Sequence, residues 1–239
     1  MKKKDRYEEM LTGNVKFLIF KLSIPTIISM LITAIYNFAD TFFVTKVEHS
    51  KEAISAVGII FSFMAIIQAI GFFFGHGSGN YISRLIGEHQ IDKAKKYATI
   101  GFVLSFSFGL LLTIFGLIFL EPLAKFLTAN KDEYVYLYAK DYLFWILLGA
   151  PFMTASNTLN NQLRYQGNAF LAMLAISSGA ILNILLDPIL IKQYAVYGAG
   201  MSTFVSQILG FGLLYICTTK RDNIHINLKY FTLNKEIIG

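Results

Sequence analysis

Charged side chains are scarce in this sequence. Asp, Glu, Lys and Arg make up only 15% of its 239 residues, whereas a soluble domain usually carries about 25%. Six stretches contain none of these residues: 22–39, 53–83, 97–120, 142–163, 165–186 and 193–219. A helix needs roughly 20 apolar residues to cross the hydrocarbon core of a bilayer. The pattern excludes a soluble enzyme, a disordered tail and a nucleic-acid-binding domain. It predicts an all-α integral membrane bundle of six transmembrane helices in a lipid bilayer.

Cysteine and the common catalytic motifs are nearly absent too. The only cysteine, Cys217, cannot form a disulfide within the chain. The sequence has no HExxH, CxxC or P-loop motif, and the glycines around His76 and Ser78 do not have the spacing of a nucleophile elbow. The basic N-terminus lacks the apolar stretch and cleavage site of a signal peptide, so the first span is expected to be retained. We therefore expect neither an enzyme nor a cofactor.

The positive charges are unevenly divided between the two sides that six spans define. Membrane proteins collect Lys and Arg in cytoplasmic loops. The side that holds both termini carries 14 Lys and Arg residues and the opposite side carries five. We therefore attribute the net charge of +6 to topology, not to nucleic-acid binding. Both termini are expected in the cytoplasm of a multi-pass protein of the cell membrane.

Three parts of the chain are predicted: a cytoplasmic lead at 1–14, a six-helix transmembrane lobe at 15–219, and a cytoplasmic tail or inter-lobe linker at 220–239. Pro25 lies inside the long first span, where a proline removes a backbone hydrogen bond, which predicts a bent or two-part helix. Pro151 and Pro188 lie inside the fourth and fifth spans, and Pro188 is predicted as a second helix bend. The second span is expected to end near Gly75, where a glycine-rich segment begins.

Two acidic residues interrupt otherwise uncharged spans. Asp40 follows 18 uncharged residues and Asp187 follows 22. A carboxylate at the centre of a membrane costs several kcal/mol, so each of them is a candidate functional group. Tyr36 and Asn183 precede these acids by four residues, which places each pair on one helix face. Asp141 lies near a span end and is interpreted as interfacial.

A pair of buried carboxyl groups allows two kinds of ion binding. Burial favours the neutral form of a carboxyl group, so Asp40 or Asp187 could bind and release a proton. Alternatively, the two carboxylates could hold a hard cation such as Na⁺ together with the Asn183 amide and the Thr203 hydroxyl. Pro188 leaves a helical carbonyl without its donor, and that oxygen could help. A purely structural role, in which protonated acids join helices, remains open.

Two further groups of residues are candidates for a substrate cavity. Asn157 belongs to an amide-rich end of the fourth span, which could line a polar cavity or simply end a helix. Met64 belongs to an aromatic and methionine-rich wall on the second span. Such side chains suit adaptable apolar binding, and packing against lipid is the alternative.

Six short segments occur in an order that resembles one transporter family. They are LSIP (22–25), YNFADT (36–41), GNYISRLIG (79–87) followed by KA (93–94), LRYQGN (163–168), NILLDP (183–188) and YGAG (197–200). Each is weak alone, but together they resemble the multidrug and toxic compound extrusion (MATE) transporters. Only the first half of the family's length is matched, and the segment after Asp40 lacks the glycines that are usual there.

The resemblance implies an antiporter that exports small amphiphilic cations in exchange for H⁺ or Na⁺, with no other cofactor. It implies two six-helix lobes around a central cavity, so this chain would be one lobe and a second lobe its partner. Carried over residue by residue, the family's cation site falls on Asp40, Asn183, Asp187 and Thr203, its polar network on Tyr36 and Asn157, and its helix bend on Pro25.

Other functions remain as alternatives. A lipid-linked precursor flippase of the same superfamily would be expected to line its cavity with cationic side chains, whereas these spans hold acids and no central Arg or Lys. A half that only assembles with a partner lobe is a second alternative. An intramembrane enzyme would need a nucleophile and a base that the spans do not supply.

Overall fold

Helices account for nearly all of the chain in the computed structural model, which describes residues 3–48, 50–129, 132–219 and 223–231. In order, the elements are α1 (Lys3–Thr12), α2 (Val15–Glu48), α3 (Lys51–Gly87), α4 (Ile91–Ile118), α5 (Leu120–Leu127), α6 (Glu133–Tyr165), α7 (Ala169–Thr218) and the 3₁₀-helix η1 (Leu228–Tyr230). No strand occurs among these described residues, which confirms the all-α prediction.

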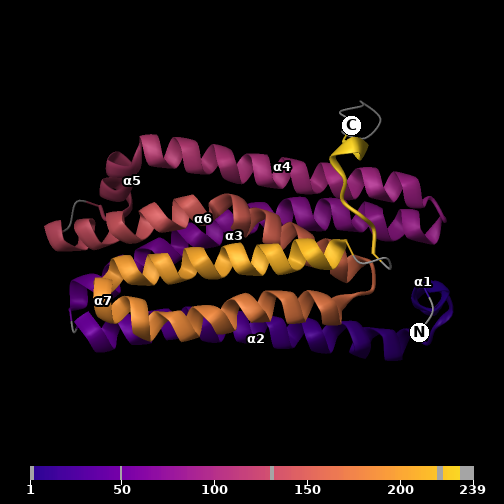
Figure 1. Ribbon diagram of the computed structural model, residues 1–239, viewed down its shortest axis with the longest axis horizontal. Coiled ribbons are helices and arrows are strands. Elements are labelled where there is room, and N and C mark those ends of the chain that lie inside the picture. Colours follow the sequence, from indigo (N-terminus) through magenta and orange to yellow (C-terminus); the bar gives the residue numbers. More distant parts are fainter. Residues whose placement is uncertain (1–2, 49, 130–131, 220–222, 232–239) are drawn as a thin grey trace.

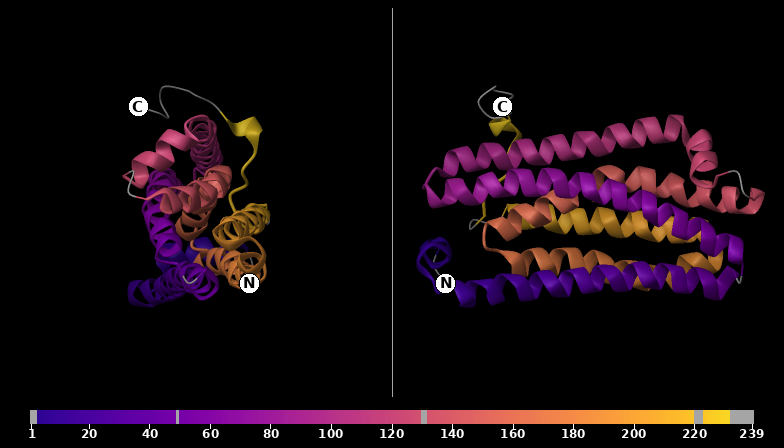
Figure 2. Two further views of the ribbon diagram at one scale, coloured as in Figure 1. Left: turned by 90° about the vertical axis from the view of Figure 1, so that its left-hand side faces the viewer. Right: turned by 180° about the vertical axis from the view of Figure 1, so that it is seen from behind.

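The long helices run side by side along one axis (Figures 1 and 2). Four of them, α2, α3, α4 and α7, are long and apolar enough to cross a membrane. The backbone of α7 reverses direction at Ala195, where φ is 54° and ψ is −135°, and Figure 1 shows the two resulting arms. The first arm (169–194) and the second arm (196–218) correspond to the fifth and sixth predicted spans. With α6 as the fourth span, the bundle contains the six predicted segments.

Helix α6 lies against α3, α4 and α7, which explains how it can be polar. Protein surrounds much of it, so its amides find partners inside the bundle. Asn160 donates to the Ala172 carbonyl at 3.0 Å, and Gln162 donates to the Ala98 carbonyl at 3.0 Å. The amide-rich end of α6 therefore packs against neighbouring helices and is not merely a helix terminus.

Pro151 in the middle of α6 leaves the carbonyl of Leu147 without its helical donor. The hydroxyl of Thr113 on α4 donates to that oxygen at 2.5 Å. A proline is tolerated in a membrane span when a side chain of a neighbouring helix replaces the lost helical hydrogen bond. Thr113 therefore joins α4 to α6 at the proline.

Replacing Thr113 by Val is expected to lower the free energy of unfolding by about 1 kcal/mol, because the Leu147 carbonyl loses its donor while side-chain volume is kept. The measurement is thermal unfolding in detergent, followed by dye labelling of the buried Cys217. Thr45→Val is the matched control, since the exposed Thr45 hydroxyl donates within its own helix to Thr41 at 2.7 Å. Equal losses in both variants would contradict the assigned role.

The glycine-rich segment after the predicted end of the second span near Gly75 does not end the helix, and where the span leaves the membrane stays a prediction. Helix α3 continues through it to Gly87. A Cβ at Gly75 would lie 3.0 Å from Asn161 on α6, and one at Gly79 would overlap the ring of Tyr165. Small residues at such positions let membrane helices approach closely. These glycines therefore allow α3 to pack closely against α6, and they do not interrupt the helix.

Helix α2 is continuous, with Pro25 inside it, so the two-part alternative is wrong and the bend at Pro25 stays a prediction. The outer face of α2 is apolar and exposed: Phe17, Phe20, Ile24, Ile27, Leu31, Ile35 and Phe38. An apolar surface this large requires a membrane or a partner. It agrees with a multi-pass membrane protein.

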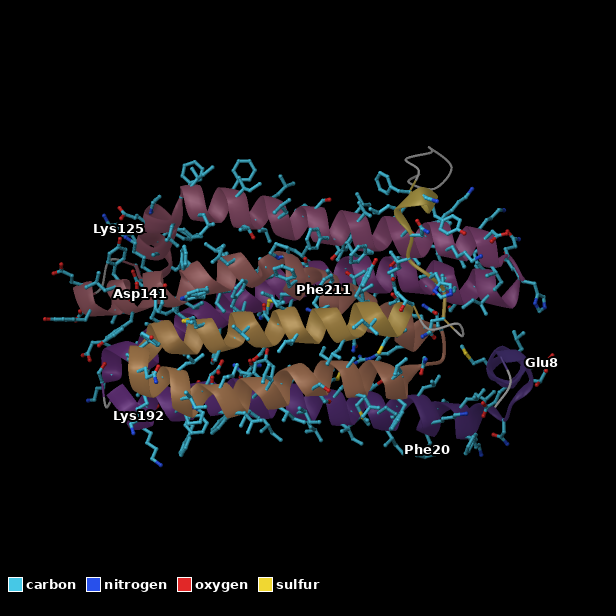
Figure 3. The ribbon with its side chains drawn as sticks, viewed as in Figure 1. Glu8, Phe20, Lys125, Asp141, Lys192 and Phe211 are labelled. Atoms are coloured by element: carbon cyan, nitrogen blue, oxygen red, sulfur yellow. The ribbon has the colours of Figure 1, made fainter. Side chains whose placement is uncertain are left out.

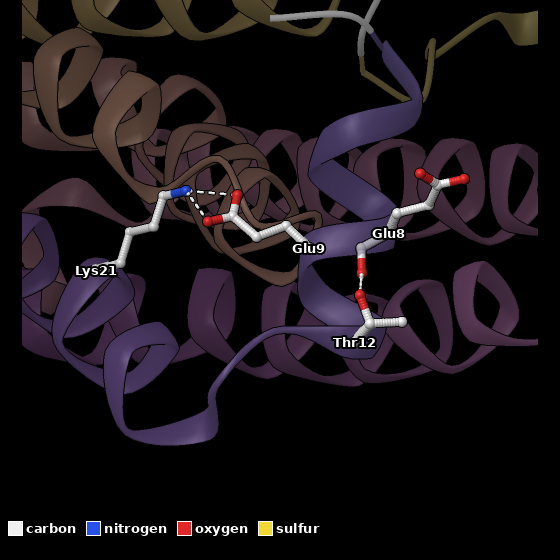
Figure 4. Close-up of polar contacts among 4 residues, drawn as sticks. All are labelled: Glu8, Glu9, Thr12 and Lys21. Atoms are coloured by element: carbon white, nitrogen blue, oxygen red, sulfur yellow. Dashed lines mark hydrogen bonds and ion pairs between the residues drawn. The ribbon is translucent and has the colours of Figure 1, made fainter.

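The connections gather at the two ends of the bundle. Helix α1 lies at one end, together with η1 (Figure 1), and Figure 3 places Lys125 and Lys192 at the other. Figure 4 shows how α1 is tied to α2: the Lys21 Nζ lies 2.6 Å from the Glu9 carboxylate. Loops that the sequence assigned to the same side of the membrane thus lie at the same end of the bundle. Which side of the membrane each end faces stays a prediction.

The described part of the predicted tail, residues 223–231, packs onto the bundle. Ile224 and Ile226 are buried, and the Ile224 amide donates to the Gln166 side chain at 2.8 Å. The remaining tail residues, 220–222 and 232–239, lie outside the described part of the chain. Residues 223–231 therefore cover the same end of the bundle as α1.

Candidate ion and substrate site

A cavity of about 280 Å³ lies among α2, α3, α6 and the two arms of α7. Four residues that the sequence indicated line it: Tyr36, Asn157, Asn183 and Thr203. The other lining residues are Ser29, Met30, Thr33, Gln68, Phe72, Met153, Ser156, Asn160, Arg164, Ile176, Gly179, Ala180, Ser206, Gln207, Gly210 and Leu214. An apolar wall with a few polar groups is usual for sites that bind small molecules.

Met64 does not line this cavity, which corrects its assignment. Its side chain is 1% exposed and lies in the core. Its sulfur is 4.0 Å from the hydroxyl of Tyr142. On α3 the cavity reaches Gln68 and Phe72, but one turn before Gln68 the ring of Tyr142 contacts Met64.

Asp40 on α2 is completely buried beside α6 and α7. Tyr142 of α6 donates to its Oδ2 at 3.3 Å. Thr203 of the second arm lies 3.4 Å from the same oxygen. The other carboxyl oxygen, Oδ1, is buried and has no hydrogen-bond partner.

Asp187 on the first arm of α7 is completely buried as well. Ser202 of the second arm donates to its Oδ1, and Asn183 donates to the same oxygen at 3.4 Å. The Asn183 amide nitrogen also lies 3.5 Å from the Thr203 hydroxyl. The reversal of α7 at Ala195 brings these side chains together, because it places the two arms against each other.

Three buried oxygens in this site have no partner: Asp40 Oδ1, Asp187 Oδ2 and Asn183 Oδ1. Asn183 and Thr203 link the two carboxyl groups: the Asn183 nitrogen lies 3.4 Å from Asp187 Oδ1 and 3.5 Å from the Thr203 hydroxyl, which lies 3.4 Å from Asp40 Oδ2. Within the described ranges, neither of them forms an ion pair with Lys or Arg. Unpaired carboxylates in such surroundings are strongly unfavourable. The arrangement suits a proton or a hard cation, which prefers oxygen ligands.

The sequence pattern did not single out Tyr142 and Ser202. Tyr142 opens the uncharged stretch of the fourth span, and Ser202 directly precedes Thr203. Each is a hydroxyl side chain in an apolar span, a signal that several other residues share. Only the packing of the helices separates these two from the rest.

Arg164, expected in the fourth loop, lies in the last turn of α6. Its side chain lines the cavity and donates to the Ser29 hydroxyl at 2.8 Å. The spans have no central Arg or Lys, as expected, but the cavity has a cationic side chain at its edge. The long side chain of Arg164 reaches Ser29 on α2, so a residue at the end of a span still contributes to the cavity.

The two prolines predicted as helix bends lie close to the site but are not part of the cavity wall. Pro188 follows Asp187 in the first arm, and Pro25 lies one turn before Ser29 on α2. Their roles as bends stay predictions.

Residues 25–189 match the family model MatE. The multidrug export protein MepA of Staphylococcus aureus (strain MRSA252) is 30% identical over 221 residues, covering 91% of this chain and 48% of MepA. MepA of Staphylococcus haemolyticus (strain JCSC1435) is 30% identical over 212 residues, covering 87% and 46%. The chain therefore spans about half the length of the curated relatives that it matches.

The chain also matches solved structures of transporters. A MOP superfamily transporter from Pyrococcus furiosus Vc1, whose binding pocket is described as having reverse polarity, matches with a TM-score of 0.87 at 32% identity, over 100% of this chain and 52% of that one. A multidrug resistance MATE transporter in an outward-facing conformation matches with identical values. An inward-facing one gives 0.77 at 33% identity, over 92% and 50%. This chain therefore belongs to the MATE family, whose members are membrane transporters and not enzymes.

Proposed function

We propose that this chain is the N-terminal lobe of an exporter that moves small amphiphilic cations out of the cell in exchange for H⁺ or Na⁺. The supporting observation is the pair of buried carboxyl groups with unpartnered oxygens directly beside the cavity. Asn183 lines the cavity and also donates to Asp187. Thr203 lines the cavity and also lies against Asp40. The cation site and the cavity therefore share part of their walls.

Shared side chains provide the coupling that antiport requires. When a proton or Na⁺ occupies the unpartnered oxygens, Asn183 and Thr203 keep their contacts with the acids, and the Asn183 Oδ1 is free to face a bound Na⁺. When a substrate fills the cavity, the same two groups are drawn toward it. Two ligands that favour different arrangements of the same residues weaken each other's binding, and this effect is reciprocal. Binding of the ion on one side of the membrane then favours release of the substrate.

The membrane context completes the proposal. Both ends of the described chain lie at one end of the bundle, which we assign to the cytoplasm because the connections at that end carry most of the Lys and Arg residues. The exposed apolar face of α2 would contact lipid or a second six-helix lobe. The half-length match to MepA supports such a lobe, either later in the same protein or on a partner chain.

Ion replacement tests the proposed exchange. The complete transporter, with its second lobe, is reconstituted in vesicles loaded with a fluorescent amphiphilic cation. Replacing external Na⁺ by choline is expected to stop efflux if Na⁺ is the coupling ion, and a protonophore is expected to stop it if H⁺ is. Efflux that continues unchanged under both treatments together would contradict ion coupling.

A lipid-linked precursor flippase is the second candidate function, because Arg164 gives the cavity a cationic side chain. Asp40 and Asp187 are not accounted for by that function, since a pyrophosphate group would be repelled by them. Reconstituted protein that flips a fluorescent lipid pyrophosphate but does not export cationic dyes would establish this alternative.

A further inference from the structure

Arg164 is the one Lys or Arg among the residues that line the cavity. The proposed cation exchange does not use it. One of its terminal nitrogens donates to the Ser29 hydroxyl at 2.8 Å. Its Nε is buried and has no hydrogen-bond partner. In the part of the chain that the structure describes, no carboxylate forms an ion pair with it. The guanidinium group is therefore largely withdrawn from water without a counter-charge.

Arg164 and the acid pair lie at different levels of the bundle. On α2, Ser29 contacts Arg164, Tyr36 lines the cavity further along, and Asp40 lies one turn beyond Tyr36. The eleven positions from Ser29 to Asp40 correspond to about 16 Å along a helix at 1.5 Å per residue. The cavity thus has a cationic group at one end and carboxyl groups behind the other.

The exposed surface of the cavity is mostly apolar, and Met30, Phe72, Ile176 and Leu214 contribute to it. Polar side chains, among them Gln68, Asn160 and Gln207, also line the cavity. The apolar part suits the hydrophobic body of an amphiphile. A molecule about as long as the cavity would therefore bring one polar end to Arg164 when its other end lies near Asn183.

A guanidinium group recognises anions in a specific way. Its donors form a planar fork that matches a carboxylate or phosphate, and hydrogen bonds between charged partners are stronger than those between neutral ones. The unpartnered Nε supplies a donor that Ser29 does not satisfy. We propose that the Arg164 end of the cavity binds the anionic group, a carboxylate or a phosphate, of an amphiphile whose body lies toward Asn183. This inference rests on the proposed function and assigns to Arg164 the contact with the anionic group of a substrate.

Two matched dyes test this site. Rhodamine B carries a free carboxylate, and its ethyl ester has the same cationic ring system without the negative charge. Binding of each is measured by fluorescence anisotropy on the complete transporter in a phosphate-free maltoside detergent. The wild type is expected to bind the acid more tightly relative to the ester than Arg164→Gln does. The ratio of the two affinities is expected to change by about tenfold.

Control variants separate recognition from folding. Arg84→Gln removes an exposed arginine that pairs with Glu88 at 2.9 Å near the end of α3, and it is expected to leave the ratio unchanged. Arg164→Lys keeps the charge but loses the planar fork, so it is expected to lower the ratio about threefold, and it serves as the test if the Gln variant does not fold. Equal ratios in the wild type and every Arg164 variant count against the site.

A lipid phosphate is the other source of the same anionic chemistry. Short-chain phosphatidic acid is added to the dye-bound protein. If a lipid phosphate occupies the site, it displaces rhodamine B from the wild type but much less from Arg164→Gln. The inference is overturned if neither the dye ratio nor this displacement depends on Arg164. Failure of the proposed function has a different signature, the absence of ion-coupled efflux of either dye whatever residue stands at position 164.

Discussion

Asp187→Asn is expected to reduce ion-coupled efflux at least about a hundredfold, to the level of vesicles without protein. The asparagine side chain has the same shape, and its oxygen can still accept from Ser202 and Asn183 as the Asp187 Oδ1 does. It can neither release a proton nor neutralise Na⁺. The substitution therefore removes the charge and leaves the packing. Efflux of a cationic dye from vesicles, driven by an imposed H⁺ or Na⁺ gradient, measures the effect.

Asp40→Asn is expected to have a similar effect, because Asn183 and Thr203 link the two carboxyl groups and the proposed ion site uses both. Asp141→Asn is the matched control. Asp141 also belongs to a long helix of the bundle, but it lies near the end that carries Lys125 and Lys192 (Figure 3) and away from the cavity. That variant is expected to keep most of the efflux. Undiminished efflux in both Asp40→Asn and Asp187→Asn would refute the assigned site.

Gly198→Ala is expected to lower the free energy of unfolding by about 3 kcal/mol or more, a large loss for overpacking. A Cβ at this position would overlap the carbonyl oxygen of Leu190 and lie 2.5 Å from its carbonyl carbon. These are backbone atoms, so no side-chain rotation can relieve the contact. The reversal of α7 would have to open, which would move Asp187 away from Ser202. Both thermal stability and efflux should therefore fall.

Gly212→Ala on the second arm is the control for that substitution. No atom outside its immediate helical neighbourhood lies within 4 Å of a Cβ built there, and alanine is a better helix former than glycine by up to about 1 kcal/mol. Gly212→Ala should therefore be as stable as the wild type or slightly more stable. Equal stability of the Gly198 and Gly212 variants would show that the reversal tolerates a side chain.

The composition of the chain was enough to predict the fold class. A bilayer penalises every charged group at its centre, whichever helices surround it, so charge-free stretches mark the spans without knowledge of their partners. The same penalty made Asp40 and Asp187 stand out. Asn183 and Tyr36 could be placed beside the acids because helical periodicity is local. The Thr203 hydroxyl was a possible oxygen ligand for a hard cation, the resemblance to MATE transporters implied the same position, and the structure places it 3.4 Å from Asp40.

Glycine and proline predicted the ends and bends of helices less well, because each residue occurs in more than one structural setting. The glycine-rich segment that contains Gly75 and Gly79 resembled the end of a span, but these glycines lie inside α3 and allow it to approach α6. Pro25 predicted a bent or two-part helix, whereas α2 is continuous. A glycine that ends a helix and one that admits a neighbouring helix are indistinguishable until the neighbour is placed.

The sequence by itself therefore determined that this protein crosses a membrane and which two carboxyl groups lie inside its spans, because both follow from the free energy of charge in hydrocarbon. Only the tertiary structure decided which side chains meet those groups. Tyr142 is 102 residues from Asp40 in the chain, and Ser202 reaches Asp187 only because α7 reverses at Ala195. Tertiary structure likewise placed Arg164 in the cavity and Met64 in the core. Contacts between residues far apart in the chain depend on how whole helices pack, and no local pattern encodes that packing.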